Sequence, residues 1–402
     1  MRASGLPGRV ERALSRGLRR LRRTDSRVVA LRPAGEPIGR ALLSYVIDGF
    51  LLPRDVAPPL SHTHFWEARE IGRILVGLGF AVDVIHWTNR DFQPDGRYDL
   101  LVDVRLNLER LAPRLGSDCL RVMHAETSHR SFHNPEQQRR LDELAARRGV
   151  RLAPQKMLEE NRAIESADAA IVVGNQATLA TYAFAGKPMW PVPISHPLLF
   201  PFPEGKDFAA CARRFLWFGS GGLVHKGLDL VLELFAALPD FHLTVCGPVD
   251  RERDFARLYR RELWETPNIR TVGWVDVASP EFLAIARETL ALLYPSCSEG
   301  MNGGTVTCMH AGLVPVVSRP TGVDVDPSCG VLLADCRPAT LRTAVLELAG
   351  RPPAELAALA RGAWETARRR NTRESFRRTW ESAMRDILAR FRPALAVRPP
   401  SA

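Results

Sequence analysis

The sequence predicts two α/β domains, each built on a mainly parallel sheet. From about Arg40, short apolar runs alternate with stretches of helical periodicity, a proline-rich stretch interrupts this alternation, and the alternation then starts again. Strands that alternate with helices form parallel sheets with helices on both faces. At 402 residues the chain is long enough to bury a core in each of two domains.

The first half of the chain predicts five strands and an early helix. The strands are expected at 41–50, 81–87, 98–104, 119–124 and 169–174, with a helical stretch after the fourth. The early helix is expected at 64–79, because Ile71, Leu75 and Leu78 fall on one face and a glycine ends the pattern.

Residues 187–206 are too rich in proline for a helix or a central strand. The six prolines are Pro188, Pro191, Pro193, Pro197, Pro201 and Pro203. We expect an interdomain linker here, and a cleft between the two halves is the usual place for a small-molecule site.

The second half repeats the alternation and ends in helices. Its strands are expected at 214–219, 241–247, 269–275, 290–295 and 314–318. Its helices are expected at 227–238, 250–263, 280–288, 304–310, 338–348, 354–369 and 374–390.

The composition is typical of a soluble protein of the cytoplasm. Apolar residues make up 46% and charged residues 25%, and no apolar run reaches the ~18 residues that span a bilayer. The seven cysteines are scattered singly, without metal-ligand spacing, as in a reducing compartment. The first thirty residues are rich in arginine and lack the apolar segment of a signal peptide.

The net charge of +10 is concentrated at the start of the chain. Residues 1–27 contain nine arginines and two acidic residues, so the remainder is nearly neutral and no nucleic-acid-binding face is expected. Val10, Leu14, Leu18 and Leu21 have the spacing of an apolar helical stripe. Such a helix can lie on an anionic membrane surface, which would make a cytoplasmic protein peripheral on the inner face of the membrane. The alternative is a disordered start to the chain.

A glycine-rich loop follows the strand expected at 214–219. Gly219, Gly221 and Gly222 let backbone N–H groups approach an anion, and Lys226-Gly227 then opens the next helix. The chain has only four lysines against 51 arginines, which makes a lysine at this place informative. The spacing differs from that of the phosphate loop of NTPases. The alternative is a tight turn with a surface lysine.

A second loop follows the strand expected at 290–295. Glu299 lies beyond the carboxyl end of that strand, and Asn302 is the expected cap of the next helix. Open α/β sheets bind ligands at this edge, where a carboxylate can hold sugar hydroxyls and a helix N-terminus can hold a diphosphate. The alternative is a glycine-rich turn with a solvated glutamate.

Together the two segments resemble the retaining glycosyltransferases of the family-4, or group-1, glycogen-synthase-like type. The matching residues, within about 209–335, are Gly219, Lys226-Gly227, Pro295-Ser296, Glu299-Gly300 and residues 312–317. The resemblance implies the GT-B fold, in which two Rossmann-like domains face each other across a cleft and a C-terminal helix returns to the N-domain. The expected parts are a basic tail (1–35), an acceptor domain (36–190), a linker (191–206), a donor domain (207–372) and a final helix and tail (373–402).

The resemblance also implies the reaction. A hexosyl unit would move from a nucleoside diphosphate sugar to an acceptor hydroxyl, with retention of configuration, and neither a cofactor nor a metal is expected. Lys226 and the helix N-terminus would stabilise the departing diphosphate, Glu299 would orient the sugar, and His124 would touch it from the other domain. The residues expected to bind the donor are Gly219, Ser220, Lys226, Asn302, Gly303, Gly304, Thr305 and Thr307.

Two positions depart from the family pattern. Gly221 stands where the family usually has an arginine, and Thr307 stands where a second glutamate would hold the ribose. These departures leave two alternatives open. One is a nucleotide-sugar 2-epimerase of the same fold, and the other is a non-catalytic binding subunit related to glycosyltransferases.

The acceptor side is expected around residues 61–70, at the start of the first helix. His62, His64 and Glu67 are the candidates, and a well-hydrogen-bonded helix start is the alternative. His129 and His133 are expected on the surface. A glycan, a lipid-linked acceptor and a small-molecule acceptor all remain open.

Overall fold

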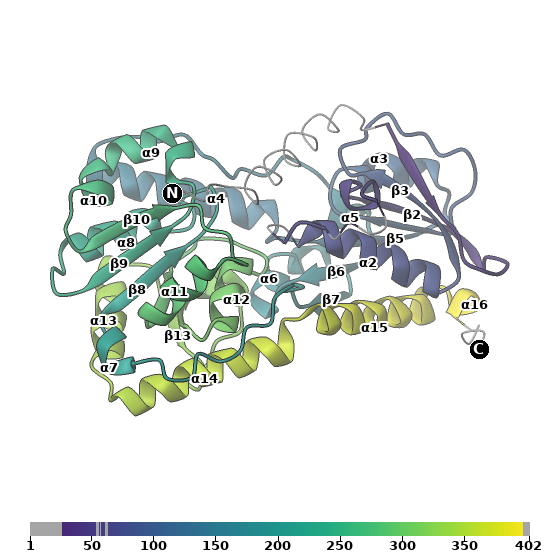
Figure 1. The fold of residues 1–402 in the computed structure, drawn as a ribbon. Helices are drawn as coiled ribbons and strands as arrows, with labels where there is room; N and C mark the ends of the chain where they lie inside the picture. Colours follow the sequence, from purple (N-terminus) through teal and green to yellow (C-terminus); the bar gives the residue numbers. More distant parts are fainter. Residues whose placement is uncertain (1–25, 54–55, 57, 61–62, 397–402) are drawn as a thin grey trace, which may run out of the picture. The chain divides into compact units, whose positions relative to one another are not determined.

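The computed structural model describes residues 26–53, 56, 58–60 and 63–396. Contacts divide the chain into two compact units (Figure 1). The first comprises Met1–His124, Asn161–Ile171 and Trp380–Ala402, and the second comprises Ala125–Glu160 and Val172–Thr379. This grouping differs from the predicted boundaries, because residues 125–160 and 172–190 were expected in the N-terminal domain.

One sheet has seven strands in the order β1-β3-β2-β4-β5-β6-β7. Their bounds are β1 Val28–Leu31, β2 Gly39–Tyr45, β3 Phe80–His86, β4 Leu100–Asp103, β5 Leu120–Ala125, β6 Ala169–Val173 and β7 Met189–Val192. Strands β2 to β5 pair in parallel, whereas β1 runs antiparallel to β3 at the edge. The buried strands β2, β3 and β4 form the core of the first unit, as the apolar runs predicted.

The first unit contains several helical segments, of which α2 and α3 contact strands of this sheet. The segments are η1 Asp48–Phe50, α2 His64–Gly77, α3 Asn107–Leu111, η2 Ala112–Arg114, α5 Ala163–Ser166, the later part of α15 (Arg373–Phe391) from Trp380 onward, and α16 Pro393–Ala396. The grouping of Trp380–Ala402 with the first unit agrees with the predicted return of the final helix.

The strand predicted at 41–50 is too long. Strand β2 ends at Tyr45, and the chain turns into a single 3₁₀ turn at Asp48–Phe50. A Cβ at Gly49 would lie 2.4 Å from the carbonyl oxygen of Phe65, so this glycine lets the turn pack against α2. The apolar run therefore continues through a turn rather than through an extended strand.

The second sheet has six strands, all parallel, in the order β10-β9-β8-β11-β12-β13. Their bounds are β8 Arg214–Phe218, β9 His242–Cys246, β10 Ile269–Gly273, β11 Ala291–Tyr294, β12 Val314–Ser318 and β13 Val331–Leu333. Helix α8 (Leu228–Ala236) contacts α10 (Arg260–Trp264) and α13 (Pro338–Ala349), whereas α12 (Gly303–His310) packs against α14 (Pro353–Arg370). This is the layered parallel arrangement that the alternation predicted.

The second unit contains most of the remaining helices. They are α4 Arg130–Arg148, α6 Gln176–Ala180, η3 Ala183–Ala185, α7 Phe208–Cys211, α8 Leu228–Ala236, η4 Val249–Arg251, α9 Arg253–Leu258, α10 Arg260–Trp264, α11 Pro280–Glu288, α12 Gly303–His310, η5 Arg319–Thr321, α13 Pro338–Ala349 and α14 Pro353–Arg370. The helix predicted at 250–263 is wrong as one element, because the backbone leaves helical geometry at Tyr259. No helix in the described part of the chain is both long enough and apolar enough to cross a membrane.

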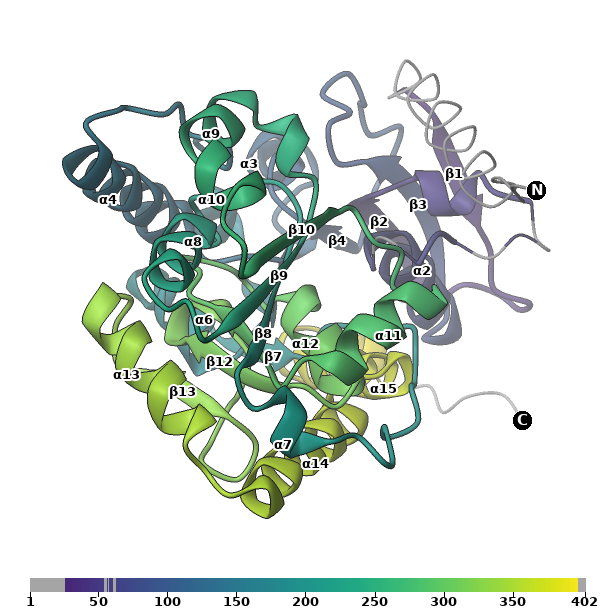
Figure 2. The same cartoon turned by 60° about the vertical axis from the view of Figure 1, so that its left-hand side comes forward.

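Helix α4 packs against the other helices of the second unit. Leu141 and Leu144 are buried in the core of that unit, and Arg147 Nη2 lies 2.5 Å from Asp229 Oδ2 of α8. Arg148 pairs with Glu262 of α10. Figure 2 shows α4 alongside α8 and α10. Two apolar anchors and two ion pairs therefore fix this helix over the parallel sheet.

The predicted linker contains strand β7. Pro191 is exposed within it, and β7 stands last in the order of its sheet. A proline cannot donate to a neighbouring strand, so it is tolerated at an edge but not in the middle of a sheet.

Candidate functional site

Lys226 lies where the loop after β8 enters α8. Its side chain is only 6% exposed. The next residue, Gly227, has φ +72°, and a Cβ there would lie 2.6 Å from Pro295 Cγ and 2.7 Å from the Pro295 carbonyl oxygen. Glycine is therefore required by both the backbone angle and the close approach. This contact brings the Lys-Gly and Pro-Ser segments, far apart in sequence, into one site.

Lys226 and Glu299 form an ion pair. The Nζ atom lies 2.5 Å from Glu299 Oε1, and Tyr294 and Ser296 each donate a hydroxyl hydrogen bond of 3.2 Å to the same oxygen. No described residue donates a hydrogen bond to the other oxygen, Oε2. The carboxylate thus has one occupied and one available oxygen.

The charge of Glu299 is set by two opposing effects. Burial favours the neutral acid and would raise the pKa, but the Lys226 ammonium and its hydrogen bond outweigh burial and lower the pKa of Glu299 to about 2. Glu299 is therefore ionised at neutral pH, and its free oxygen can accept hydrogen bonds from hydroxyl groups.

The N-terminus of α12 faces the same edge of the sheet. Asn302 caps it as predicted, since Oδ1 accepts from Thr305 N at 2.7 Å, and Asn302 Nδ2 donates to the Tyr294 hydroxyl at 2.9 Å. The backbone N–H groups of Gly303 and Gly304 have no acceptor among the described residues. Two open amides at the positive end of a helix dipole form a place for an anion.

The side chains of Thr305 and Thr307 form hydrogen bonds within α12 and its cap. Thr305 Oγ1 donates to Asn302 Oδ1 at 3.0 Å, and Thr307 Oγ1 donates to the Gly303 carbonyl oxygen at 2.8 Å. Both side chains are buried. The hydroxyl proton of Thr307 is thus used within α12.

The glycine-rich loop is partly occupied by a residue that the sequence did not point to. Glu252 accepts hydrogen bonds from the amides of Gly222 and Leu223, and the Gly219 amide donates to the Cys246 carbonyl oxygen at 3.0 Å. Ser220 is exposed at the tip of the loop. Glu252 lies thirty residues after Gly222, and no local pattern marks it, so sequence reasoning missed it.

Two histidines predicted on the surface are buried. His133 donates from Nε2 to the Lys156 carbonyl oxygen at 2.7 Å, which leaves Nδ1 to accept from Ser298 Oγ at 3.1 Å. His129 caps α4, with its ring accepting from Ser131 N. The prediction of exposed histidines is therefore wrong, because both rings are buried and form hydrogen bonds within the protein.

The remaining candidates lie in the first unit. His124 is fully buried, with ring centroids 5.5 Å from Tyr45 and 6.5 Å from Trp380. His64 and Glu67 lie in the first turn of α2, where the Tyr45 hydroxyl donates to Glu67 Oε2 at 3.4 Å. His62 lies outside the described residues. The roles of these residues toward the sugar and the acceptor stay predictions.

A lysine, a carboxylate and open helix amides at the carboxyl edge of a parallel sheet define an α/β protein with a site suited to phosphate and sugar groups. Residues 212–351 match the family model described as Glycosyl transferases group 1. No curated protein sequence matches the chain.

Solved structures resemble the chain over most of its length. Sucrose-phosphate synthase from Thermosynechococcus elongatus has a TM-score of 0.61 at 15% identity, covering 90% of this chain and 100% of its own. A glycosyltransferase from Rickettsia africae has a TM-score of 0.55 at 11% identity, covering 87% and 99%. Anabaena HepE in complex with UDP-glucose has a TM-score of 0.51 at 14% identity, covering 72% and 79%. The predicted α/β fold of the GT-B type is confirmed.

Proposed function

We propose that this chain is a retaining glycosyltransferase that moves a hexosyl unit from a nucleoside diphosphate sugar to an acceptor hydroxyl, in the synthesis of a glycan, glycolipid or polysaccharide. The observation that carries the proposal is the Lys226–Glu299 pair beside the open amides of Gly303 and Gly304. Lys226 and the two amides suit a diphosphate, and Glu299 suits sugar hydroxyls. The Anabaena neighbour was solved with UDP-glucose, which makes uridine nucleotides the first donors to test.

The reaction follows from these positions. The bond between the anomeric carbon and the diphosphate oxygen breaks, and the acceptor oxygen bonds to that carbon. Lys226 keeps two N–H protons beyond the one directed at Glu299, and these stabilise the charge that develops on the diphosphate. The departing phosphate oxygen takes the acceptor proton, so no side chain is assigned as the base and no metal is needed.

The first unit supplies the other contacts in this proposal. His124 touches the donor sugar, and His62, His64 and Glu67 line the acceptor side. The acceptor is a glycan, a lipid-linked molecule or a small molecule. Residues 1–27 bring the protein to an anionic membrane surface at the inner face, where a lipid-linked acceptor would be presented.

A donor-binding protein without turnover is the second candidate. Thr307 has no carboxylate for a ribose and uses its hydroxyl proton inside α12, and Glu252 occupies two loop amides. A 2-epimerase of the same fold is the third. Incubation of a nucleotide sugar with and without acceptors separates the three: transfer, epimerisation without acceptor, or binding alone.

The role of Lys226 can be tested by UDP affinity. Lys226→Ala should weaken UDP binding by about 1.5–3 kcal/mol, the usual worth of a charged hydrogen bond, as measured by isothermal titration calorimetry. Lys187→Ala, which alters a lysine outside the site, should leave UDP affinity unchanged.

Glu299 is partly buried, and without its partner it can destabilise the fold. The double variant Lys226→Met with Glu299→Gln removes both charges and should show the same loss of UDP affinity with unchanged circular dichroism. UDP affinity that survives in both variants would reduce Lys226 to a turn residue.

A further inference from the structure

A second cavity lies at the carboxyl ends of β11, β12 and β13, apart from the Lys226 site. Its volume is about 590 Å³, within the usual range for small-molecule pockets. Helix α4 contributes one wall, and the segments after the three strands contribute the other. The arginines that line it are Arg139, Arg140, Arg147, Arg319 and Arg337, against the acidic residues Glu136, Glu143 and Asp335.

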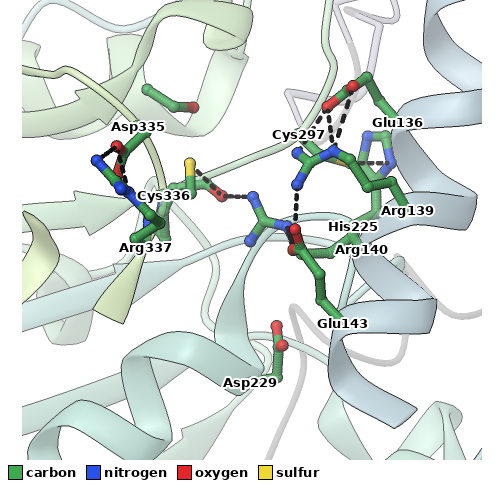
Figure 3. Close-up of polar contacts among 12 residues, drawn as sticks. Glu136, Arg139, Arg140, Glu143, His225, Asp229, Cys297, Asp335, Cys336 and Arg337 are labelled. Atoms are coloured by element: carbon green, nitrogen blue, oxygen red, sulfur yellow. Dashed lines mark hydrogen bonds and ion pairs between the residues drawn. The ribbon is translucent and has the colours of Figure 1, made fainter. Parts of the chain in front are cut away.

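Arg140 is fully buried and only partly satisfied. Its Nη2 donates to the Pro295 carbonyl oxygen at 2.9 Å, whereas Nη1 has no hydrogen-bond partner among the described residues. The nearest carboxylate oxygen paired with it is Glu143 Oε2, 4.0 Å from Nε, on a side chain that is 44% exposed. Figure 3 shows the guanidinium between Glu143 on one side and Cys336 with Arg337 on the other. Burying a guanidinium N–H group that has no acceptor lowers the stability of the fold, unless an anion or a water molecule accepts that hydrogen bond.

The other arginines differ in how far their charge is neutralised. Arg139 pairs with Glu136 and Glu143, and Arg337 pairs with Asp335. Arg319, which is exposed just after β12, forms no ion pair with a described residue. Arg147 pairs with Asp229 and Glu233 outside the cavity lining. This leaves Arg140, whose only carboxylate partner is 4.0 Å away, and Arg319, without an ion pair to a described residue, as the lining arginines most open to an anion.

We propose that this cavity binds a small anion that presents a phosphate or carboxylate group on a body of about sugar size. The planar fork of N–H donors in arginine matches both groups. The unmet Nη1 of Arg140 would bind the charged group, with Arg319 as a second contact. Ser296 lines the cavity and donates to Glu299, so the anion site adjoins the proposed sugar site. Anion binding in the cavity does not depend on the protein being a transferase.

The test uses the full-length chain and isothermal titration calorimetry. Inorganic phosphate, glucose 6-phosphate and gluconate are titrated separately, so that the arms distinguish the phosphate group, the sugar body and the carboxylate. Binding should persist in the presence of saturating UDP and in Lys226→Ala, because the proposed site does not use Lys226.

Two substitutions and a matched control locate the site. Arg140→Met should weaken binding at least about tenfold, as loss of a charged hydrogen bond predicts. Arg319→Gln changes an exposed residue without an ion pair, so it should weaken binding several-fold with an unchanged melting temperature, even if Arg140→Met folds poorly. Arg287→Gln, an exposed arginine on α11 before the opposite end of β11, should have no effect.

The proposal is overturned if none of the three anions binds at millimolar concentration, which would leave a buried water as the partner of Arg140. It is also overturned if an anion binds but UDP displaces it, or if Arg319→Gln leaves its affinity unchanged. None of these results bears on the Lys226 test above.

Discussion

At the scale of single residues, Glu299 is held by contacts on both sides of its loop. Its side-chain oxygen Oε1 accepts hydrogen bonds from Lys226, Tyr294 and Ser296. Behind it, the Ser298 carbonyl oxygen accepts from His225, whose pKa burial lowers to about 3. That ring is therefore neutral at pH 7 and adds no second charge beside Lys226. The Lys226 ammonium is the main charge that acts on Glu299, and Lys156 adds a smaller effect of the same sign.

Glu299→Gln should distinguish a contact with the sugar from a contact with the phosphate. We expect turnover to fall at least about tenfold, because an amide forms weaker hydrogen bonds to a hydroxyl than a carboxylate does. The affinity for free UDP should stay the same or increase, since Lys226 loses its counter-charge. Steady-state kinetics and calorimetry measure the two effects. Equal losses of turnover and of UDP affinity would place Glu299 at the phosphate instead.

The same variant should change acid stability. The pKa of Glu299 is lowered from 4.5 to about 2, so the ionised side chain contributes stability above pH 4.5 that is lost as the pH falls toward 2. Between these values Glu299→Gln should lose less stability than the unaltered protein. Glu281→Gln, at an exposed position of α11, should follow the unaltered protein. If Glu299→Gln and the unaltered protein lose the same stability as the pH falls, the ion pair is contradicted.

At the scale of elements, Gly227 joins the two segments of the site. Its φ of +72° and the 2.6 Å approach to Pro295 leave no room for a side chain. We expect Gly227→Ala to lower the free energy of unfolding by more than about 1–2 kcal/mol, the cost of the left-handed conformation alone. Gly77→Ala, where nothing lies within 4 Å of an added Cβ, should instead raise it by about 0.5–1 kcal/mol. Urea unfolding of both variants checks the pair.

Elements were predictable where the periodicity was strong. Strand β12 and helix α11 have the predicted bounds, Val314–Ser318 and Pro280–Glu288, because a short buried run and a capped amphipathic helix are unambiguous. Strands β1, β7 and β13 were missed. Each has only three or four residues, and such short strands depend on neighbours distant in sequence rather than on a local pattern.

At the scale of the whole chain, partners were harder to predict than elements. The sequence predicts that a helix follows β5, but not that Leu141 and Leu144 bury its apolar face in the second unit. Likewise, Lys226 and Glu299 were each predicted as site residues, whereas their 2.5 Å contact and the role of Glu252 depend on long-range packing. Local periodicity shows that a face is buried, but it does not show what covers it.

The final prediction concerns the charge of the chain as a whole, which is concentrated in residues 1–27. Their nine arginines should bind anionic vesicles, at about 1 kcal/mol per basic residue near the surface, and added salt should weaken this binding because the Debye length is only ~8–10 Å near physiological ionic strength. Strand β1, which the sequence did not predict, begins at Val28, so a deletion should stop short of it. Deleting residues 2–23 removes eight of the arginines and should abolish co-sedimentation with vesicles while circular dichroism stays unchanged.

A variant with serine at Leu14, Leu18 and Leu21 keeps every charge and should bind more weakly if the apolar stripe inserts into the membrane. If the full-length protein ignores anionic vesicles at low salt, the tail has no membrane role and a soluble acceptor becomes the better proposal.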